Sequence, residues 1–135
     1  EQETVDIVVP ISRTADFIRF INDLEAQSGM QMVSFGHAGD GNVHLCVVRG
    51  ERDEETWQRE LHENMDRAYA EAYRLGGVAS GEHGIGLSKR PYFLRQTAKE
   101  NLQAMNAIKT ALDPQHILNN RKSYLTGGNN NAGTF

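Results

Sequence analysis

The order of apolar and polar residues along the chain predicts strands and helices in alternation. Residues 5–9 are mostly β-branched and are followed by a proline, which predicts a strand. Apolar residues then recur at three- and four-residue spacing to about Gln27, as they do on one face of a helix. We expect Ser12 or Thr14 to cap this helix and Ser28-Gly29 to end it.

Residues 31–48 predict a β-hairpin. Two β-type runs flank a turn at residues 38–42 with the sequence AGDGN. Glycine and asparagine accept a positive φ, and aspartate bonds its own backbone, so this turn favours a tight loop between antiparallel strands.

The second half of the chain predicts two further helices, one on each side of a glycine-rich loop. Residues 51–75 begin with charged side chains and then carry one apolar stripe, and two glycines follow. Residues 77–89 contain four glycines and little periodicity, which predicts a loop. Thr97 and Glu100 have the spacing of a capping box, so a third helix is expected from there to Leu112.

This order of elements predicts an α+β fold, with a ferredoxin-like antiparallel sheet and helices on one of its faces. We expect one domain over residues 1–125. Residues 126–135 are rich in glycine and asparagine, and we expect them to form a disordered tail. The chain opens directly on a strand-like run, and we expect it to be part of a longer protein.

Composition excludes several classes of protein. The chain has 135 residues, of which 39% are hydrophobic and 24% charged, as in a globular domain with a modest core. A net charge of −4 gives no electrostatic reason to expect nucleic acid. No apolar run approaches the ~18 residues of a membrane span. The single cysteine, Cys46, cannot form an internal disulfide, which fits a cytoplasmic location.

Four residues beside glycines are candidates for chemistry. His37 and His44 stand at the two mouths of the hairpin turn, and Glu82-His83 lies in the glycine-rich loop. If the first two histidines pair across the hairpin, their Cβ atoms lie roughly 5 Å apart on one face. Two imidazoles and a carboxylate can bind a divalent transition ion. Alternatively, the histidines bind backbone groups and Glu82 caps a helix near Leu87.

Other catalytic motifs have less support. His62 begins a pattern like that of a zincin helix, but Asp66 stands where the second histidine should be. The loop after residue 80 lacks the Gly-Lys-Ser/Thr of a P-loop. A nucleophile mechanism with Ser80, Ser34 or Cys46 stays open, although Cys46 lies in an apolar run and is expected to pack in the core.

Two long motifs resemble a known family. GHAGDGNVH at residues 36–44 and SGEHGIG at residues 80–86, followed by Lys89, resemble the C-terminal (cap) domain of FAD-linked oxidases. That family includes D-lactate dehydrogenase, glycolate oxidase and D-2-hydroxyglutarate dehydrogenase. The opening VVP with Ser12-Arg13, and the closing ALDP followed by ILN, extend the resemblance to about Lys122.

The resemblance implies a metal site and a general base. In the family, the two histidines of the first motif and the glutamate of the second bind a divalent ion, often zinc or manganese. Here these residues are His37, His44 and Glu82. The following histidine, His83, is implied as the base that takes the substrate hydroxyl proton. The implied cofactor is FAD, bound mainly by a domain that precedes this segment.

The resemblance also implies further contacts and partners. Asn119 is predicted to contact the cofactor, and Arg13 and Asn42 the substrate. The expected partners are a small 2-hydroxy acid, the protein's own FAD-binding domain and an electron-acceptor protein. Two departures affect these expectations. The family's closing Asn-Pro-Gly-Lys reads NNRK from Asn119, and Cys46 replaces an asparagine that reaches the substrate in some members.

The sequence therefore predicts the substrate- and metal-binding part of an FAD-dependent enzyme that oxidises a small D-2-hydroxy acid of the lactate or glycolate type. The isolated chain is expected to be inactive, because the hydride acceptor is absent. Two other functions stay open. One is a non-catalytic ferredoxin-like module that binds a ligand or a partner, and the other is a zinc hydrolase that uses metal-bound water.

Overall fold

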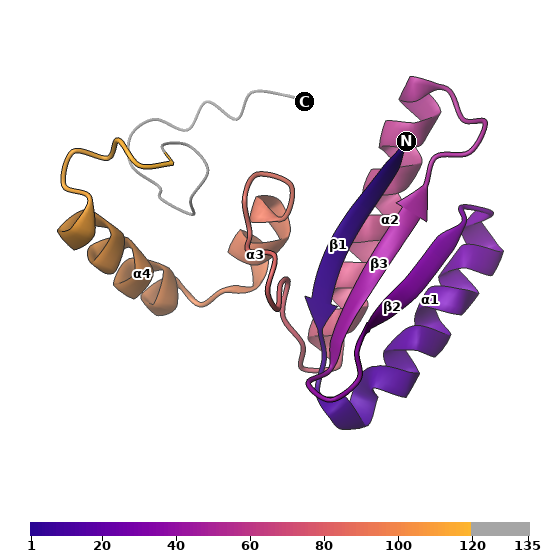
Figure 1. The fold of residues 1–135 in the computed structure, drawn as a ribbon, viewed down its shortest axis with the longest axis horizontal. Helices are drawn as coiled ribbons and strands as arrows, with labels where there is room; N and C mark the ends of the chain where they lie inside the picture. Colours follow the sequence, from indigo (N-terminus) through magenta and orange to yellow (C-terminus); the bar gives the residue numbers. More distant parts are fainter. Residues whose placement is uncertain (120–135) are drawn as a thin grey trace. The chain divides into compact units, whose positions relative to one another are not determined.

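The structure, a computed structural model, describes residues 1–119 (Figure 1). The predicted tail at residues 126–135 lies outside the described residues. The chain divides into two compact units, Glu1–Gly84 and a second unit that begins at Ile85. The prediction of one domain over residues 1–125 stays a prediction.

The first unit contains one sheet and two long helices. Its elements follow the order βαββα, which is five of the six elements of a ferredoxin-like unit, so the predicted α+β class is confirmed. The elements are β1 (Gln2–Val8), the 3₁₀ turn η1 (Ile11–Arg13), α1 (Thr14–Ser28), β2 (Met32–His37), β3 (Asn42–Val48) and α2 (Glu54–Arg74).

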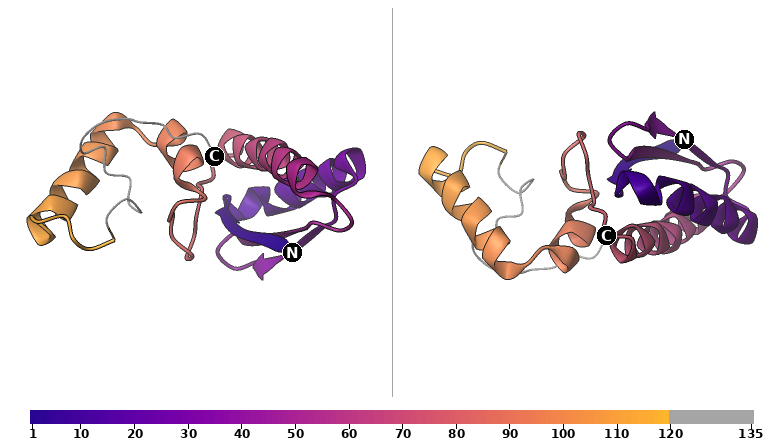
Figure 2. Two further views of the ribbon diagram at one scale, coloured as in Figure 1. Left: turned by 90° about the horizontal axis from the view of Figure 1, so that it is seen from above. Right: turned by 90° about the horizontal axis from the view of Figure 1, so that it is seen from below.

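The sheet is antiparallel throughout, with the strand order β1-β3-β2. Val5 pairs with Leu45 and Ser34 pairs with Leu45 from the other side, so these three side chains share a face. Both helices lie on one side of the sheet, as predicted (Figures 1 and 2). The core of the unit is formed by side chains that are almost fully buried: Val5, Ile7, Phe17, Ile21, Leu24, Leu45, Val47, Trp57, Met65 and Tyr69.

The ends of the two helices differ partly from prediction. Neither Ser12 nor Thr14 caps α1, because the chain enters the helix through η1, in which the Arg13 amide donates to the Pro10 carbonyl at 2.7 Å. Gly29 ends α1 in the left-handed region at φ 66°, as predicted. Asp53 caps α2 by accepting the Thr56 amide at 2.8 Å.

The second unit contains α3 (Arg90–Gln96) and α4 (Lys99–Leu112). The sequence did not predict α3, because seven residues are too few to show a helical period. The predicted capping box is wrong: the Thr97 hydroxyl donates to the Phe93 carbonyl at 2.7 Å, inside the last turn of α3. α4 therefore begins after Ala98 without a side-chain cap.

Among the described helices, none is both long enough and apolar enough to cross a membrane.

Candidate metal centre

The candidate site is formed by two segments of the first unit, the β2–β3 hairpin and a bend at residues 80–83 that follows α2. The hairpin turn is closed locally, because the Asp40 carboxylate accepts the Asn42 amide at 3.1 Å. Gly41 has a φ of 76°, and a Cβ there would lie 2.0 Å from the Val9 carbonyl oxygen. The turn sequence thus sets the end of the hairpin and places a histidine on each strand.

The strand register brings the two histidines together diagonally. His37 pairs with Asn42, and His44 pairs with Phe35, so the two histidines are not direct partners across the hairpin. They still share a face, because Asn42 and His44 are two residues apart on β3. Their ring centroids are 5.3 Å apart in an edge-to-face arrangement.

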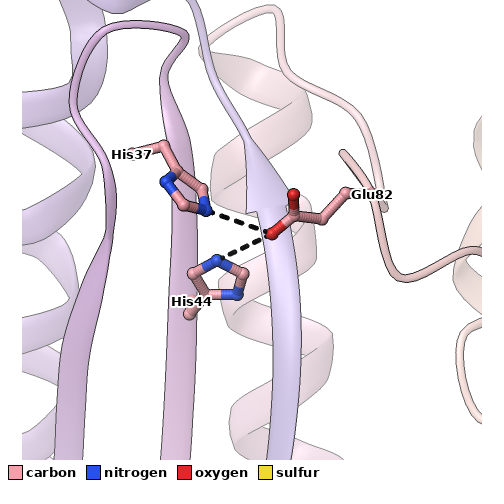
Figure 3. A group of neighbouring side chains, drawn as sticks. All are labelled: His37, His44 and Glu82. Atoms are coloured by element: carbon pink, nitrogen blue, oxygen red, sulfur yellow. Dashed lines mark hydrogen bonds and ion pairs between the residues drawn. The ribbon is translucent and has the colours of Figure 1, made fainter.

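Glu82 reaches both imidazoles with one oxygen. Its Oε1 lies 3.2 Å from His37 Nε2 and 3.1 Å from His44 Nε2 (Figure 3). The three potential ligand atoms all lie within 4.8 Å of one another. The His44 side chain is buried, whereas those of His37 and Glu82 are about half exposed. The cluster is therefore anchored in the sheet on one side and accessible from the other.

This donor set fits a divalent transition ion. Neutral imidazole nitrogen and carboxylate oxygen are both common zinc ligands, and manganese also accepts them. Three protein ligands leave coordination positions free, as in catalytic sites. The alternative interpretation of Glu82 as a helix cap is wrong, because the next helix begins at Arg90 and the carboxylate points at the imidazoles (Figure 3).

His83 lies beside this cluster. Its ring centroid is 4.8 Å from that of His44. Its Nδ1 lies 3.6 Å from Asp6 Oδ1, and its Nε2 lies 4.0 Å from Glu82 Oε1. The side chain is 43% exposed, so a small molecule at the cluster can reach it.

The three candidate nucleophiles lie in different surroundings. The Ser80 hydroxyl donates to the two oxygens of Asp6 at 3.0 and 3.1 Å. Ser34 shares a face with Leu45, on the side that the helices cover. Cys46 is buried, as predicted. None of these three side chains is placed as the nucleophile of a histidine pair.

The other predicted site residues are not among the three clustered ligands. Asn42 is only 4% exposed, and its amide lies where a Cβ on Gly81 would approach to 2.9 Å. Arg13 pairs with Asp16 at 2.8 Å at the start of α1. Asn119 belongs to the second unit and has a φ of 49°. Substrate or cofactor contact by these three residues stays a prediction.

Asp6 was not predicted from the sequence. This carboxylate is fully buried on β1, directly opposite His44, and it accepts hydrogen bonds from the bend that carries Glu82. The signal that could have found it is a charged residue inside a β-branched run, since unpaired charges are almost never fully buried.

Comparison with known proteins gives a consistent result. Residues 1–123 match the family model described as FAD linked oxidases, C-terminal domain. The chain is 38% identical over 114 residues to D-lactate dehydrogenase of Anaerostipes hadrus, a match that covers 84% of this chain and 24% of the relative. It is 39% identical over 123 residues to glycolate oxidase subunit GlcD of Bacillus subtilis, with 88% and 25% covered.

A third relative is the mitochondrial D-lactate dehydrogenase [cytochrome] of Kluyveromyces lactis, 36% identical over 121 residues, with 90% of this chain and 20% of the relative covered. The chain thus spans about a quarter of the length of the curated relatives that it matches.

Proposed function

Because this chain belongs to the family of FAD-linked oxidase C-terminal domains, we propose that it is the substrate- and metal-binding part of an FAD-dependent enzyme that oxidises a small D-2-hydroxy acid. The observation that carries the proposal is the convergence of His37, His44 and Glu82 on one point within a chain of this family. The names of the relatives, D-lactate dehydrogenase and glycolate oxidase subunit GlcD, support the substrate class.

His37, His44 and Glu82 would hold the ion, zinc or manganese. A bound divalent ion supplies positive charge that polarises a substrate hydroxyl. His44 is fixed by the sheet, while the exposed sides of His37 and Glu82 leave room for a small hydroxy acid. Both imidazoles present Nε2 to the cluster, so their Nδ1 atoms are left for other partners.

His83 is the proposed base. Its ring lies beside His44 at 4.8 Å, close enough to meet a hydroxyl that is bound at the cluster. A neutral imidazole nitrogen can accept such a proton and release it to water. FAD, when bound, supplies the hydride acceptor. Most of its binding site is proposed to lie outside this chain, in a separate FAD-binding domain.

The metal part of the proposal is tested on the full-length protein, meaning the whole gene product that contains this chain. Elemental analysis is expected to find about one equivalent of zinc, manganese or iron, since one cluster of ligands is proposed. His37→Ala is expected to lose this ion because it removes one of three ligands. His62→Ala is the matched control, since His62 is an exposed residue of α2 that pairs with Asp66 on the same helix. Full retention of the ion by His37→Ala would contradict the ligand assignment.

The redox part is tested by reduction of the flavin. Under anaerobic conditions, D-lactate or glycolate is expected to bleach the flavin of the full-length protein, and L-lactate is the control. A full-length protein that binds no flavin would contradict the proposed FAD-dependent oxidation. Hydrolysis of an ester or peptide, with no flavin reduction, would favour a hydrolase that uses the same ligands.

We further propose that the enzyme acts in the cytoplasm and passes its electrons to an acceptor protein. The name of the Kluyveromyces lactis relative, D-lactate dehydrogenase [cytochrome], supports a protein acceptor. The single Cys46 is buried as a free thiol, which suits a reducing compartment. Cell fractionation tests the location, and finding the protein only in an organelle or outside the cell would contradict it.

A further inference from the structure

We propose that Asp6 is the positioning residue of this site, because it holds the bend at residues 80–83 so that Glu82 stands in its ligating position before any ion binds. The inference rests on the proposed function, since it concerns the same cluster. It adds a residue that belongs neither to the ligand set nor to the proposed base.

Asp6 occupies an unusual place for a carboxylate. It lies in the middle of β1 between Val5 and Ile7, it pairs with His44 of β3, and it has no exposed surface. Its neighbours Val5 and Ile7 point into the core under the helices, so Asp6 points to the opposite face, on which His44 lies. Burial of a carboxylate costs free energy unless hydrogen bonds compensate for the lost water.

Four donors to this carboxylate come from one bend. Asp6 Oδ2 accepts the backbone amides of Gly81 at 2.7 Å, Glu82 at 2.6 Å and His83 at 3.1 Å. The Ser80 hydroxyl donates to the same carboxylate at 3.0 and 3.1 Å. Successive backbone amides that converge on one oxygen form an anion-binding nest. Here the anion is part of the protein.

Three of these four donors are backbone amides, so the bonds fix the backbone of the bend. A Cβ on Gly81 would lie 2.6 Å from Val8 Cγ2 and 2.9 Å from the Asn42 amide, so the bend is pressed against β1 and β3. The Glu82 side chain is half exposed, and its carboxylate faces the imidazoles of the cluster. Asp6 therefore sets the backbone position of Glu82, from which this side chain extends toward the imidazoles.

The same carboxylate faces His83. Asp6 Oδ1 lies 3.6 Å from His83 Nδ1, which is too long for a hydrogen bond but close enough to attract this edge of the ring whenever Nδ1 carries a proton. The opposite nitrogen, Nε2, then faces Glu82 Oε1 at 4.0 Å. Asp6 thus orients both functional side chains of the bend, one through its backbone and one through its ring.

The first test uses hydrogen exchange on the metal-free full-length protein. Peptides that cover residues 81–83 are expected to exchange at least about 100-fold more slowly than a peptide that covers the exposed turn at Gly39, because their amides are bonded to a buried carboxylate. Exchange at the rate of the exposed turn would overturn the proposal, because the bend would then be unordered without the ion.

The second test uses Asp6→Asn, which keeps the size of the side chain but replaces one acceptor oxygen with a donor. Cobalt(II) and zinc are the probes. We expect a loss of zinc affinity of about 10- to 100-fold and a changed visible spectrum of bound cobalt(II). The control is Asp53→Ala, which removes the cap of α2 and weakens the fold without touching the cluster. It is expected to keep the wild-type zinc affinity.

Affinities are compared at a temperature at which circular dichroism shows all variants folded. Wild-type zinc affinity in folded Asp6→Asn would overturn the proposal. If Asp6→Asn does not fold, Ser80→Ala serves instead, since it removes one donor to the carboxylate. It is expected to bind zinc several-fold more weakly and to exchange faster at residues 81–83, and a variant unchanged in both measurements would overturn the proposal.

The outcomes separate this inference from the proposed function. A full-length protein that binds zinc but does not oxidise any 2-hydroxy acid refutes the reaction, while the comparison of Asp6→Asn with wild type still decides the role of Asp6. A protein that binds no ion refutes the metal claim, and exchange at residues 81–83 in the metal-free protein then decides whether Asp6 orders the bend.

Discussion

Two side chains of this site, His37 and His44, lie near backbone positions that require glycine. Gly36 has a φ of 146°, and a Cβ there would lie 2.2 Å from the Asn42 carbonyl oxygen, next to His37. Gly41 is equally confined beside Val9. At the scale of the residue, these two glycines allow close backbone approach at the hairpin, and this approach helps to place the histidines on either side of the turn.

Gly41→Ala is expected to destabilise the full-length protein by roughly 2 kcal/mol or more, since the substitution combines a left-handed φ with a steric clash. Gly39→Ala in the same turn is the matched control, because a Cβ there meets nothing within 4 Å and φ is not positive. Chemical unfolding followed by circular dichroism measures both variants. Equal stability of the two variants would contradict the assigned geometry of the turn.

His83→Gln is expected to slow flavin reduction by the hydroxy acid by about 10²- to 10⁴-fold, the usual contribution of a general base. The ion is expected to stay bound, because His83 is not among the three clustered ligands. Stopped-flow absorbance measures the rate and elemental analysis the metal. His62→Gln on the exposed side of α2 is the control. An unchanged rate in His83→Gln would remove this residue from the mechanism.

At the scale of the element, α2 packs against the face of the sheet that is opposite the site. It contributes Trp57, Met65 and Tyr69 to the core, and it ends just before the bend that carries Glu82. The Gly77 amide donates to the Ala72 carbonyl, and Val8 and Val78 exchange backbone hydrogen bonds at 3.2 and 2.8 Å. These hydrogen bonds hold the segment after α2 against β1. The bend that follows therefore lies next to Asp6.

Trp57→Ala is expected to lower the free energy of unfolding by about 3–5 kcal/mol, because the indole is 1% exposed and its removal leaves a cavity. Ile11→Ala is the control, since Ile11 is 61% exposed and should change stability by less than about 0.5 kcal/mol. Urea unfolding of the full-length protein, followed by circular dichroism, distinguishes them. A small effect of Trp57→Ala would mean that α2 is not packed against the core.

The cap of α2 predicts a pH dependence. The Thr56 amide, and then its hydroxyl, donate to Asp53 and hold the pKa of this carboxyl below its ordinary value. The cap therefore stabilises the fold fully above the ordinary pKa of aspartate, and this part is lost as pH falls through the lower folded-state pKa. Asp53→Asn should make the melting temperature less dependent on pH below about pH 4. An unchanged pH profile would contradict this contribution.

At the scale of the whole molecule, several large apolar side chains among residues 1–119 are exposed. Val33 and Phe35, on the same face of the sheet as His44, are 45% and 57% exposed, and in α4 Ile108 and Leu112 are 62% and 79% exposed. The matches cover only about a quarter of the length of the relatives. Under the proposed function, we expect a separate FAD-binding domain to cover some of these exposed side chains.

The isolated chain is accordingly expected to be colourless and inactive, while the full-length protein is expected to be yellow from bound FAD. Absorption spectra of the two purified proteins, and assays with D-lactate and glycolate, measure the difference. An isolated chain that binds flavin would show that the cofactor site lies within these residues. This result would contradict the proposal that FAD is bound mainly by a separate domain.

Local patterns in the sequence were sufficient for the α+β class, the hairpin at residues 31–48, α1, α2 and α4, because hydrophobic period and turn chemistry act between near neighbours. The family motifs also named His37, His44 and Glu82 as a group. The short helix α3 and the absent caps of α1 and α4 were not predicted, since single caps depend on how the chain enters a helix.

Only the tertiary structure decided how the site is assembled. The diagonal placement of His37 and His44 follows from a strand register that the turn alone did not reveal. The contact of Glu82 with both imidazoles, and the burial of Asp6 under amides some 75 positions away, depend on packing of α2 and its following bend against β1. Contacts between residues so distant in the chain leave no period in the sequence, because only folding brings them together.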